Sequence, residues 1–432
     1  MTAASASPLR LGIAGLGTVG IGVVKIIQRH ADLLAARSGR PVVITAVSAR
    51  DRTKNRDADL SNYAWEVDPV TLATRDDVDV FVELMGGHEG AARAATEAAL
   101  AAGKDVVTAN KALLAHHGHA LAEMAEAAGR VIRFEAAVAG GIPVIKALTE
   151  GLAGNQIRRV MGVMNGTCNY ILTRMETAGL PYDTVFEEAR QLGYLEADPN
   201  LDVGGIDAGH KLAILAAIAF GTKVSFDDVV LEGIGRISID DIRRAGDMGY
   251  KIKLLGVAQM TGRGLEQRMT PCLVPDSSPL GQLQGGTNMV VLEGDSVGQI
   301  VLRGAGAGEG PTASAVMGDV LDLARGLRLP TFGQPAATLS TPVAAVASAP
   351  AAYYLRLQLM DKPGALAKVA TVLGDAGVSI SRMRQYGHAD TSAPVLIVTH
   401  KTTRDAIDVA IARFPATNVV EGEPVAIRIE EV

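Results

Sequence analysis

The sequence predicts an α/β protein with an N-terminal doubly wound parallel sheet, a central α+β region and a small C-terminal βαββαβ module. Three observations predict this class. Strands and helices alternate from residue 9 to residue 135, long strands of period two follow residue 250, and a strand–helix–strand pattern begins at residue 353. Alternating strands and helices are typical of parallel sheets, whereas period-two runs indicate strands with one buried face.

A glycine-rich turn comes directly after the first predicted strand, Leu9–Ala14. The turn is Gly15-Leu-Gly-Thr-Val-Gly20, and an amphipathic helix follows it at Ile21–Ile27. Strand, G-x-G-x-x-G and helix form the dinucleotide-binding fingerprint of Rossmann-type sheets, because the glycines let a pyrophosphate approach the helix N-terminus. We therefore predict a nicotinamide cofactor here. The alternative is an ordinary turn between a strand and a helix.

The choice between NAD and NADP depends on the end of the second strand, Val42–Val47. NAD enzymes usually place an acid there to hold the ribose 2′-hydroxyl. This strand instead ends near Ala49 and Arg50, with Asp51 next, and Arg50 with Lys54 or Arg56 would pair with a 2′-phosphate. The sequence favours NADP and leaves NAD open. A solvated basic loop is the alternative.

Two further strand ends point towards the same crevice. The strand Asp79–Met85 is followed by Gly86-Gly87. After a helix over 91–102, the strand Asp105–Thr108 is followed by Ala109-Asn110-Lys111. Because the carboxyl ends of parallel strands face the ligand crevice, Lys111 is predicted to point to where nicotinamide and substrate meet. The alternative for Lys111 is an ordinary surface lysine.

The last strand of the first sheet is predicted at Val131–Glu135, and a Gly140-Gly141 pair and Pro143 follow it. Pro143 suits the first turn of a helix. The glycine pair frees backbone carbonyls to face a ligand or a monovalent cation, although a simple bend also fits.

An acid-rich stretch contains the strongest candidates for catalysis. Glu196, Asp198, Asp202, Asp207 and Lys211 fall within the nineteen residues that begin at Gly193. The acids before Gly204-Gly205 are predicted to lie in a loop. Asp207 and Lys211 are four apart, and therefore share one face of a helix whose continuation, Leu212–Phe220, is apolar all round and predicted to be buried. A partly buried lysine at such a helix mouth suits proton exchange near neutral pH, whereas the alternative is a surface ion pair.

The central region is predicted to form a separate sheet with covering helices. Its strands are expected at Val160–Met164, Lys251–Ala258, Gln267–Val274 and Asn288–Glu293, and a turn over 165–169 leads into a helix at Tyr170. A second glycine-rich loop, 303–310, precedes Pro311 at a helix start. Its backbone amides are a further candidate for contact with phosphate.

Residues 333–352 are rich in Ala, Pro, Ser and Thr, and we predict a linker that makes few contacts. The module after it has strands at Tyr353–Leu359, Val378–Arg384 and Ala393–Thr399, with a helix at Ala365–Leu373 after the Asp361–Gly364 turn.

Composition excludes several function classes. The 432 residues carry a net charge of −6, so there is no basic footprint for nucleic acid. No apolar run has transmembrane length, the first ten residues lack an apolar signal region, and two cysteines form no disulfide framework or zinc pattern. We expect a cytoplasmic protein without nucleic-acid or membrane partners.

Five segments carry a resemblance to a known family. They are the glycine-rich start, Thr108-Ala-Asn-Lys111, the segment from Glu135 to Pro143, Asn165-Gly-Thr-Cys-Asn-Tyr-Ile-Leu172 and the stretch from Gly193 to Lys211. Together they resemble homoserine dehydrogenase over nearly the whole chain. The segment after residue 353 resembles an ACT domain, which senses amino acids in such enzymes. The resemblance implies a Rossmann domain at 1–135 completed by part of 305–332, a substrate and catalytic domain at 136–332, a linker at 333–352 and an ACT domain, ferredoxin-like in its βαββαβ order, at 353–432.

The resemblance implies reversible, NAD(P)-dependent interconversion of L-homoserine and L-aspartate 4-semialdehyde in threonine, methionine and isoleucine synthesis. Lys211 would exchange the proton, Lys111 would polarise the same oxygen or orient the substrate, and Asp207 would hold the substrate and Lys211 in place. The other implied substrate residues are Glu196, Asp202, Gly166 and Thr167. The implied cofactor residues are Gly15, Leu16, Gly17, Thr18, Val19, Gly20, Ala49, Arg50, Lys111, Gly193 and Gly308. The implied site for Na⁺ or K⁺ consists of Glu135, Val138, Gly140 and Ile142.

Two other functions and several partners stay open. Cys168 would serve as the nucleophile of an acylating semialdehyde dehydrogenase, although His88 and His210 lack a recognisable spacing to it. A non-enzymatic amino-acid sensor is the third class. Gly364 would let a feedback amino acid, threonine first, approach the module's helix N-terminus. We expect a homodimer or homotetramer, and expect a chain ended near Gln334 to fold and oxidise homoserine without threonine inhibition.

Overall fold

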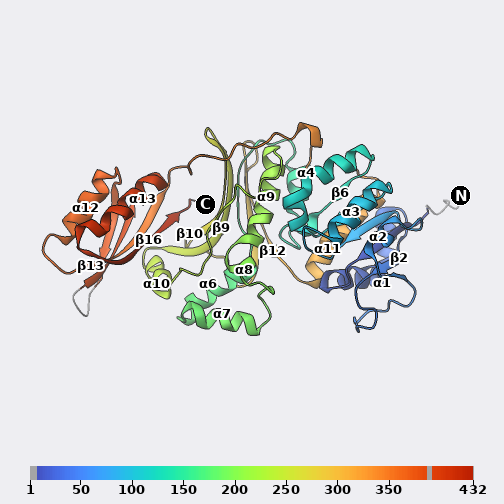
Figure 1. Cartoon of the computed structure of the whole chain (residues 1–432), viewed down its shortest axis with the longest axis horizontal. Helices are drawn as coiled ribbons and strands as arrows, with labels where there is room; N and C mark the ends of the chain where they lie inside the picture. The colour runs from blue at the N-terminus through green and yellow to red at the C-terminus, as the bar shows by residue number, and fades with distance from the viewer. Residues whose placement is uncertain (1–6, 387–391, 432) are drawn as a thin grey trace.

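The computed structural model describes residues 7–386 and 392–431. Residues 1–6 of the predicted nucleotide-binding domain, and 387–391 and 432 of the predicted ACT module, lie outside the described residues. The N-terminal sheet lies at one end of an elongated molecule, the C-terminal module at the other, and the central sheet between them (Figure 1). Among the described helices, none is long and apolar enough to cross a bilayer.

The N-terminal sheet has six parallel strands in the order β3-β2-β1-β4-β5-β6. The chain moves outward from β1 on both sides, which creates a switch point between β1 and β4 where cofactors bind in doubly wound sheets. The strands are β1 (Leu9–Ala14), β2 (Val42–Ser48), β3 (Ala64–Glu66), β4 (Val80–Glu83), β5 (Asp105–Thr108) and β6 (Ile132–Arg133). The helices are α1 (Thr18–Ser38), α2 (Pro69–Thr74), α3 (Ala91–Ala101), α4 (Lys111–Ala127) and, from later in the chain, α11 (Glu309–Ala324), which packs on α1.

The second sheet is mixed and follows the order β12-β11-β7-β9-β10-β16-β13-β15-β14. Its central strands are β7 (Ile157–Val163), β9 (Tyr250–Thr261), β10 (Gly264–Pro275), β11 (Thr287–Gly294) and β12 (Gly298–Ala305), and β8 (Val230–Leu231) pairs with β10. The surrounding helices are α5 (Val144–Lys146), α6 (Gly166–Ala178), α7 (Tyr182–Gln191), α8 (Asn200–Val203), α9 (Ile206–Phe220) and α10 (Ile239–Asp247). The apolar helix α9 packs against β7, β9 and β10 on one side and α4 on the other.

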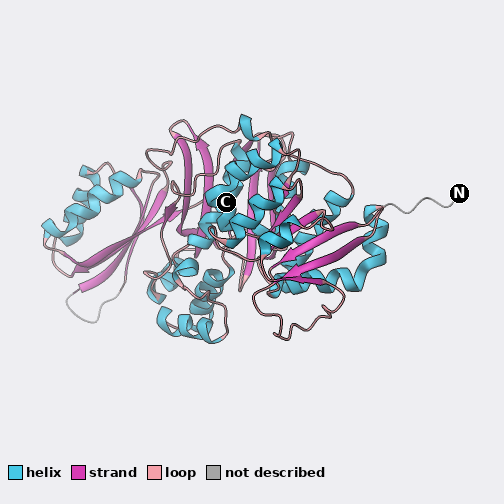
Figure 2. Ribbon diagram, turned by 45° about the vertical axis from the view of Figure 1, so that its right-hand side comes forward, coloured by secondary structure: helices cyan, strands magenta, loops and turns pink. Residues whose placement is uncertain are grey.

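The C-terminal module has the predicted βαββαβ order, and its helices gather on one face of its strands (Figure 2). Its elements are β13 (Ala352–Met360), α12 (Ala365–Asp375), β14 (Ile380–Gln385), β15 (Ser392–Thr399), α13 (Arg404–Arg413) and β16 (Val420–Ile429). The predicted fold class, an α/β protein with a parallel N-terminal sheet, a mixed central sheet and this module, is confirmed.

The expectation that few contacts tie the module to the rest of the chain is wrong. Strand β16 pairs in parallel with β10, so the module continues the central sheet. The buried Arg268 of β10 forms ion pairs with Glu266, at 3.0 Å, and with Glu430. Arg356 of β13 reaches the fully buried Asp241 of α10 at 2.5 Å.

The segment predicted as a linker also packs. Ser340 forms a bridge with Thr222, Ala344 with Leu265, and Leu339 is buried. The Ala- and Pro-rich composition correctly excludes a long helix here. Composition does not reveal that the backbone of such a segment pairs with neighbouring strands.

Three local expectations are corrected. The strand predicted at 131–135 is shorter, because Glu135–Ala137 turns into a 3₁₀ helix. Asp202 lies in the short helix α8 and not in a loop, and Cys168 lies in α6 and not in a turn. Pro199 precedes α8 and Asn165 precedes α6. Both residue types are typical of turns, but both also favour the start of a helix.

A buried lysine in β9 has a measurable consequence for stability. Lys253 donates hydrogen bonds to Asn169, at 3.0 Å, and to the carbonyl of Leu283, and burial lowers its pKa to about 8. Above that pH the folded chain binds fewer protons here than the unfolded chain, so the free energy of unfolding rises with pH. We expect a contribution of up to about 1.4 kcal/mol per pH unit between pH 8 and 10.

Denaturant unfolding from pH 7 to 10 measures this slope. Lys253→Met should remove it, whereas Lys401→Met, at an exposed lysine, should leave it unchanged. Equal slopes in the wild type and the Lys253 variant would show that Lys253 does not titrate in this range.

Candidate active site

A carboxylate between two lysines lies where α9 meets α4. Asp207, the second residue of α9, accepts from Lys111 Nζ at 2.8 Å through Oδ1 and from Lys211 Nζ at 2.7 Å through Oδ2. Lys211 also donates to the carbonyl oxygen of Met164 at 2.9 Å. Lys111 is the first residue of α4, directly after β5, so the predicted crevice brings together both lysines and the acid.

The charges of this group support one another. Burial alone would raise the pKa of Asp207, but Lys211 and Lys111 hold it well below the usual carboxyl range. Burial likewise opposes the charge on Lys111, and Asp207, Glu196 and Asp202 outweigh it, so the pKa of Lys111 is raised. Ionised Asp207 therefore stabilises the folded chain above the ordinary carboxyl range, and this contribution is lost as the pH falls.

Asp202 forms hydrogen bonds with the segments that carry the other predicted substrate residues. Its buried carboxylate accepts from Asn165 Nδ2 and from the backbone N–H of Glu196, each at 2.9 Å. Thr167 donates to the carbonyl of Tyr194 at 2.9 Å, which fixes the loop after Gly193 against the start of α6. Both oxygens of Asp202 therefore fix the position of Asn165 and of the Glu196 backbone. The Glu196 side chain itself is exposed to solvent.

The glycine-rich turn has the geometry for a pyrophosphate. Gly15 has φ +98°, and a Cβ there would lie 2.4 Å from the carbonyl oxygen of Leu84, so only glycine fits. Among the described residues, a Cβ at Gly17 would meet nothing within 4 Å, and no side chain caps α1. The N-terminus of α1 is therefore open to a ligand, and its amides suit an anion.

The basic loop after β2 divides into two groups. Arg56 donates to the carbonyls of Leu16, at 3.2 Å, and Asp51, and its guanidinium lies 5.5 Å from the ring centre of Trp65. Arg56 therefore braces the loop against the glycine-rich turn. Arg50, at the end of β2, is exposed beside Ala49.

Two glycine loops meet at the edge of the nucleotide-binding domain. A Cβ at Gly140, where φ is +53°, would lie 2.5 Å from the carbonyl of Gly306, and Gly141 N–H donates to the carbonyl of Ala305 at 3.0 Å. Gly308, with φ +118°, begins α11 in the same loop. The buried Glu135 carboxylate accepts from the N–H groups of Ile145 and Lys146, and burial raises its pKa to about 7.

Comparison with known proteins identifies this arrangement. Sequence families described as homoserine dehydrogenase, its NAD-binding domain and the ACT domain match residues 143–321, 15–135 and 353–414. A homoserine dehydrogenase of Neisseria gonorrhoeae is 43% identical over 98% of this chain and 99% of its own length. The chain belongs to the homoserine dehydrogenase family.

Solved structures of the family agree with the fold. A homoserine dehydrogenase from Thiobacillus denitrificans superposes with a TM-score of 0.93 at 39% identity, covering 99% of this chain and 100% of that one. A hyperthermophilic archaeal homoserine dehydrogenase in complex with NADPH superposes with a TM-score of 0.64 at 25% identity, covering 75% of this chain and 99% of that one. The chain is an oxidoreductase with an NAD(P)-binding domain.

Family membership overturns both alternative functions. The acylating alternative also fails on chemistry, because Cys168 is fully buried and burial raises its pKa well above that of a free thiol. Its Sγ donates to the carbonyl of Asp202 at 3.3 Å. The sensor alternative fails because the chain is an enzyme that carries the ACT domain as one of its parts.

Sequence reasoning missed two features of the site. Asn165 caps α6 through Cys168 N–H while it holds Asp202, a role that its position before a helix signals. The rings of His88 and His116 lie 4.4 Å apart, and His210 lies 5.5 Å from His116, at the junction of α4 and α9. Burial lowers the pKa of His210 to about 4, so it is neutral beside the two lysines at pH 7.

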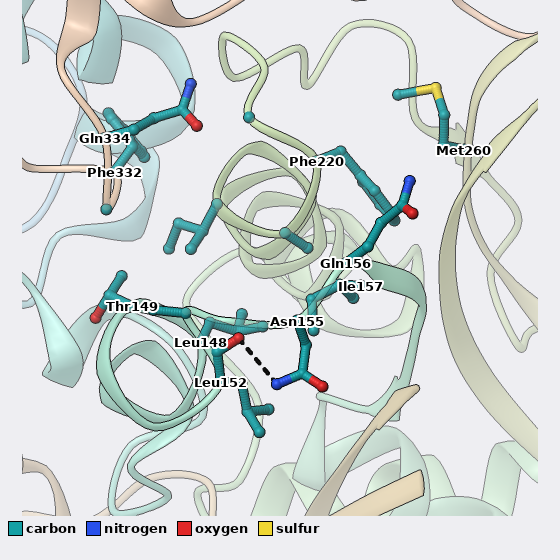
Figure 3. Close-up of a pocket in the computed structure, with 15 residues that line it drawn as sticks. Leu148, Thr149, Leu152, Asn155, Gln156, Ile157, Phe220, Met260, Phe332 and Gln334 are labelled. Atoms are coloured by element: carbon teal, nitrogen blue, oxygen red, sulfur yellow. Dashed lines mark hydrogen bonds between the residues drawn. The ribbon is translucent and has the colours of Figure 1, made fainter. Parts of the chain in front are cut away.

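A separate pocket of about 320 Å³ lies at the opposite, C-terminal end of α9 (Figure 3). Phe220, Leu148, Leu152 and Phe332 form its apolar walls, and the amides of Asn155 and Gln334 border it. None of its lining residues belongs to the predicted site, so we do not assign it to catalysis.

Proposed function

We propose that the chain catalyses the reversible oxidation of L-homoserine to L-aspartate 4-semialdehyde, with Lys211 as the general acid–base. The observation that carries this assignment is the Lys111–Asp207–Lys211 group at the carboxyl edge of the nucleotide-binding sheet. Oxidation of an alcohol removes a hydride from carbon and a proton from oxygen, so a group that exchanges a proton must face the hydroxyl.

The residues divide this work. Lys211 takes the hydroxyl proton during oxidation and returns it during reduction. Lys111, held protonated by Asp207, donates a hydrogen bond to the same oxygen or orients the substrate. Glu196 accepts from the substrate ammonium, Gly166 and Thr167 contact the substrate, and Asp202 holds Asn165 and the Glu196 loop in place.

The cofactor when bound accepts or supplies the hydride at its nicotinamide. The open N-terminus of α1 and the cradle at Gly15 fit a dinucleotide, with Leu16, Gly17, Thr18, Val19 and Gly20 around its pyrophosphate. Ala49, Arg50, Lys111, Gly193 and Gly308 complete the proposed contacts. NADP is the proposed partner because Arg50 is exposed at the position of the 2′-phosphate, whereas Arg56 already serves backbone carbonyls.

Arg50→Ala should test this choice. Loss of a charge-assisted phosphate contact costs roughly 1.5–3 kcal/mol, so NADP should bind more than tenfold more weakly. NAD lacks the phosphate and should bind as before. The measurement is the KM of each cofactor, and equal weakening of both would show that Arg50 is structural.

The remaining assignments concern the cation, the regulator and the assembly. The neutral carbonyl oxygens of Glu135, Val138, Gly140 and Ile142 are a donor set that suits Na⁺ or K⁺, because the Glu135 carboxylate itself is engaged by two amides. Gly364, with φ +84° at the N-terminus of α12, is the proposed contact for threonine. A homodimer or homotetramer acting in the cytoplasm completes the proposal.

The decisive experiment for the function is a spectrophotometric assay. Homoserine with NADP, and separately with NAD, should produce reduced nicotinamide without added phosphate or coenzyme A. Absence of turnover with either cofactor, in both directions, would reject the proposed reaction.

A further inference from the structure

A large polar cavity lies at the end of the nucleotide-binding sheet away from the active site. Its volume is about 710 Å³, and it opens between the amino ends of β1, β4 and β5 and the turn that follows α4. Five cations line it, namely Arg10, Arg40, Lys104, Arg130 and Arg328. The proposed reaction uses none of them.

Two of the three lining acids are already saturated by arginines. Asp79 accepts from Arg10 through its backbone N–H, Nε and Nη2, at 2.9, 3.1 and 2.7 Å. Asp105 accepts from both Nη atoms of Arg328, at 2.7 Å each, and from Val131 N–H. The third acid, Asp76, is exposed at the rim.

The three other cations, Lys104, Arg40 and Arg130, form no ion pair with a carboxylate among the described residues. Lys104 Nζ is directed at the backbone carbonyls of Arg75 and Val78, and Arg40 donates to the carbonyls of Ser7 and Pro8, at 2.8 and 2.9 Å. Carbonyls satisfy hydrogen bonds but do not neutralise these charges, which only the nearby carboxylates, Asp76 among them, offset in part. The lining groups therefore sum to two net positive charges from five cations and three acids.

Arg130 supplies the most direct indication of a ligand. Its Nε is buried and has no hydrogen-bond partner among the described residues. The guanidinium lies beside Gly103, in ordinary contact with the position that a Cβ there would occupy, 3.7 Å from Nη2. Buried polar donors in proteins are almost always paired, and an unpaired one indicates a bound water or ion.

We propose that this cavity is a binding site for a small phosphate-class anion, which Arg130 and Arg40 hold and Lys104 attracts. Guanidinium groups bind tetrahedral oxyanions through charge-assisted, often bidentate hydrogen bonds. The site is distinct from the cofactor site, since it lies at the opposite ends of the same strands.

Thermal unfolding in rising inorganic phosphate tests the proposal, with chloride holding the ionic strength constant and NADPH saturating the cofactor site. A ligand that binds only the folded chain raises Tm logarithmically once its concentration exceeds its dissociation constant. We expect this rise in the wild type, and we expect it to begin at about tenfold or more higher phosphate concentration in Arg130→Gln and in Arg40→Gln. Arg413→Gln, at an exposed position in α13, should match the wild type.

Arg50→Gln separates this site from the cofactor site. This variant should show the same rise of Tm with inorganic phosphate as the wild type. Loss of the effect in Arg50→Gln but not in Arg130→Gln would assign the phosphate to the cofactor site and overturn the proposal. A rise of Tm that is equal in the wild type and in all variants would also overturn the proposal. Should Arg130→Gln fold poorly, Arg40→Gln at the rim decides the outcome alone.

Discussion

Replacing Lys211 by alanine is expected to lower kcat by ~10²–10⁴, the usual scale for loss of a general acid–base. The reason is its position, with Nζ 2.7 Å from Asp207 and 2.9 Å from the Met164 carbonyl at the mouth of a buried helix. The KM for NADP should change little, because the glycine-rich turn and the Arg50 loop are elsewhere. Initial rates with saturating homoserine and NADP measure the effect.

Two controls keep this result interpretable. Lys401→Ala removes an exposed lysine whose partner is Glu431 and should turn over normally. Thermal unfolding of the Lys211 variant should show that the fold persists. Near-normal turnover of Lys211→Ala would remove this lysine from the mechanism.

A chain that ends at Gln334 is expected to be strongly destabilised, contrary to the expectation from composition. The truncation removes β16, which pairs with β10. It also removes Glu430, which pairs with the buried Arg268, and Arg356, which pairs with Asp241. Arg268 keeps Glu266, whereas Asp241 loses Arg356. Removing one partner of a buried ion pair typically costs about 3–5 kcal/mol where the other charge stays buried without compensation. Denaturant unfolding of the truncated and full chains measures the loss.

Glu430→Ala tests the ion pairs of Glu430, with Arg268, Arg428 and Arg159, without truncating the chain. It should reproduce much of the destabilisation, whereas Glu431→Ala, next to it but exposed, should cost little. If the truncated chain and Glu430→Ala unfold at the denaturant concentration of the full chain, the ACT domain is attached loosely, as its composition first indicated.

The sequence predicted the parts of the fold that local patterns encode. Strand, glycine-rich turn and helix occur together at residues 9–27, and Asp207 and Lys211 share a helix face because their spacing is four. These features depend on neighbouring residues. The rule that carboxyl strand ends share one edge predicted that Lys111 faces the crevice, whereas its contact with Asp207 of α9 is seen only in the fold.

The features that sequence reasoning missed depend on pairing between distant segments. Nothing local in Val420–Ile429 shows that it pairs with β10, or that Glu430 lies beside Arg268. Asp202 is predicted to bind substrate, and the fold adds that its oxygens also accept from Asn165 and from the N–H of Glu196. An acid's type shows that it accepts hydrogen bonds, and only the fold shows from which donors.

The central claim, that Lys211 and not Lys111 exchanges the proton, is tested most directly by chemical rescue. Homoserine oxidation by Lys211→Ala and Lys111→Ala should be measured in rising concentrations of small primary amines, at constant pH and ionic strength. An external amine replaces a missing proton acceptor but cannot replace a residue that only orients substrate. We expect amines to restore turnover in Lys211→Ala, in proportion to their basicity, and not in Lys111→Ala. Rescue of Lys111→Ala alone would contradict the central claim and assign the proton transfer to Lys111.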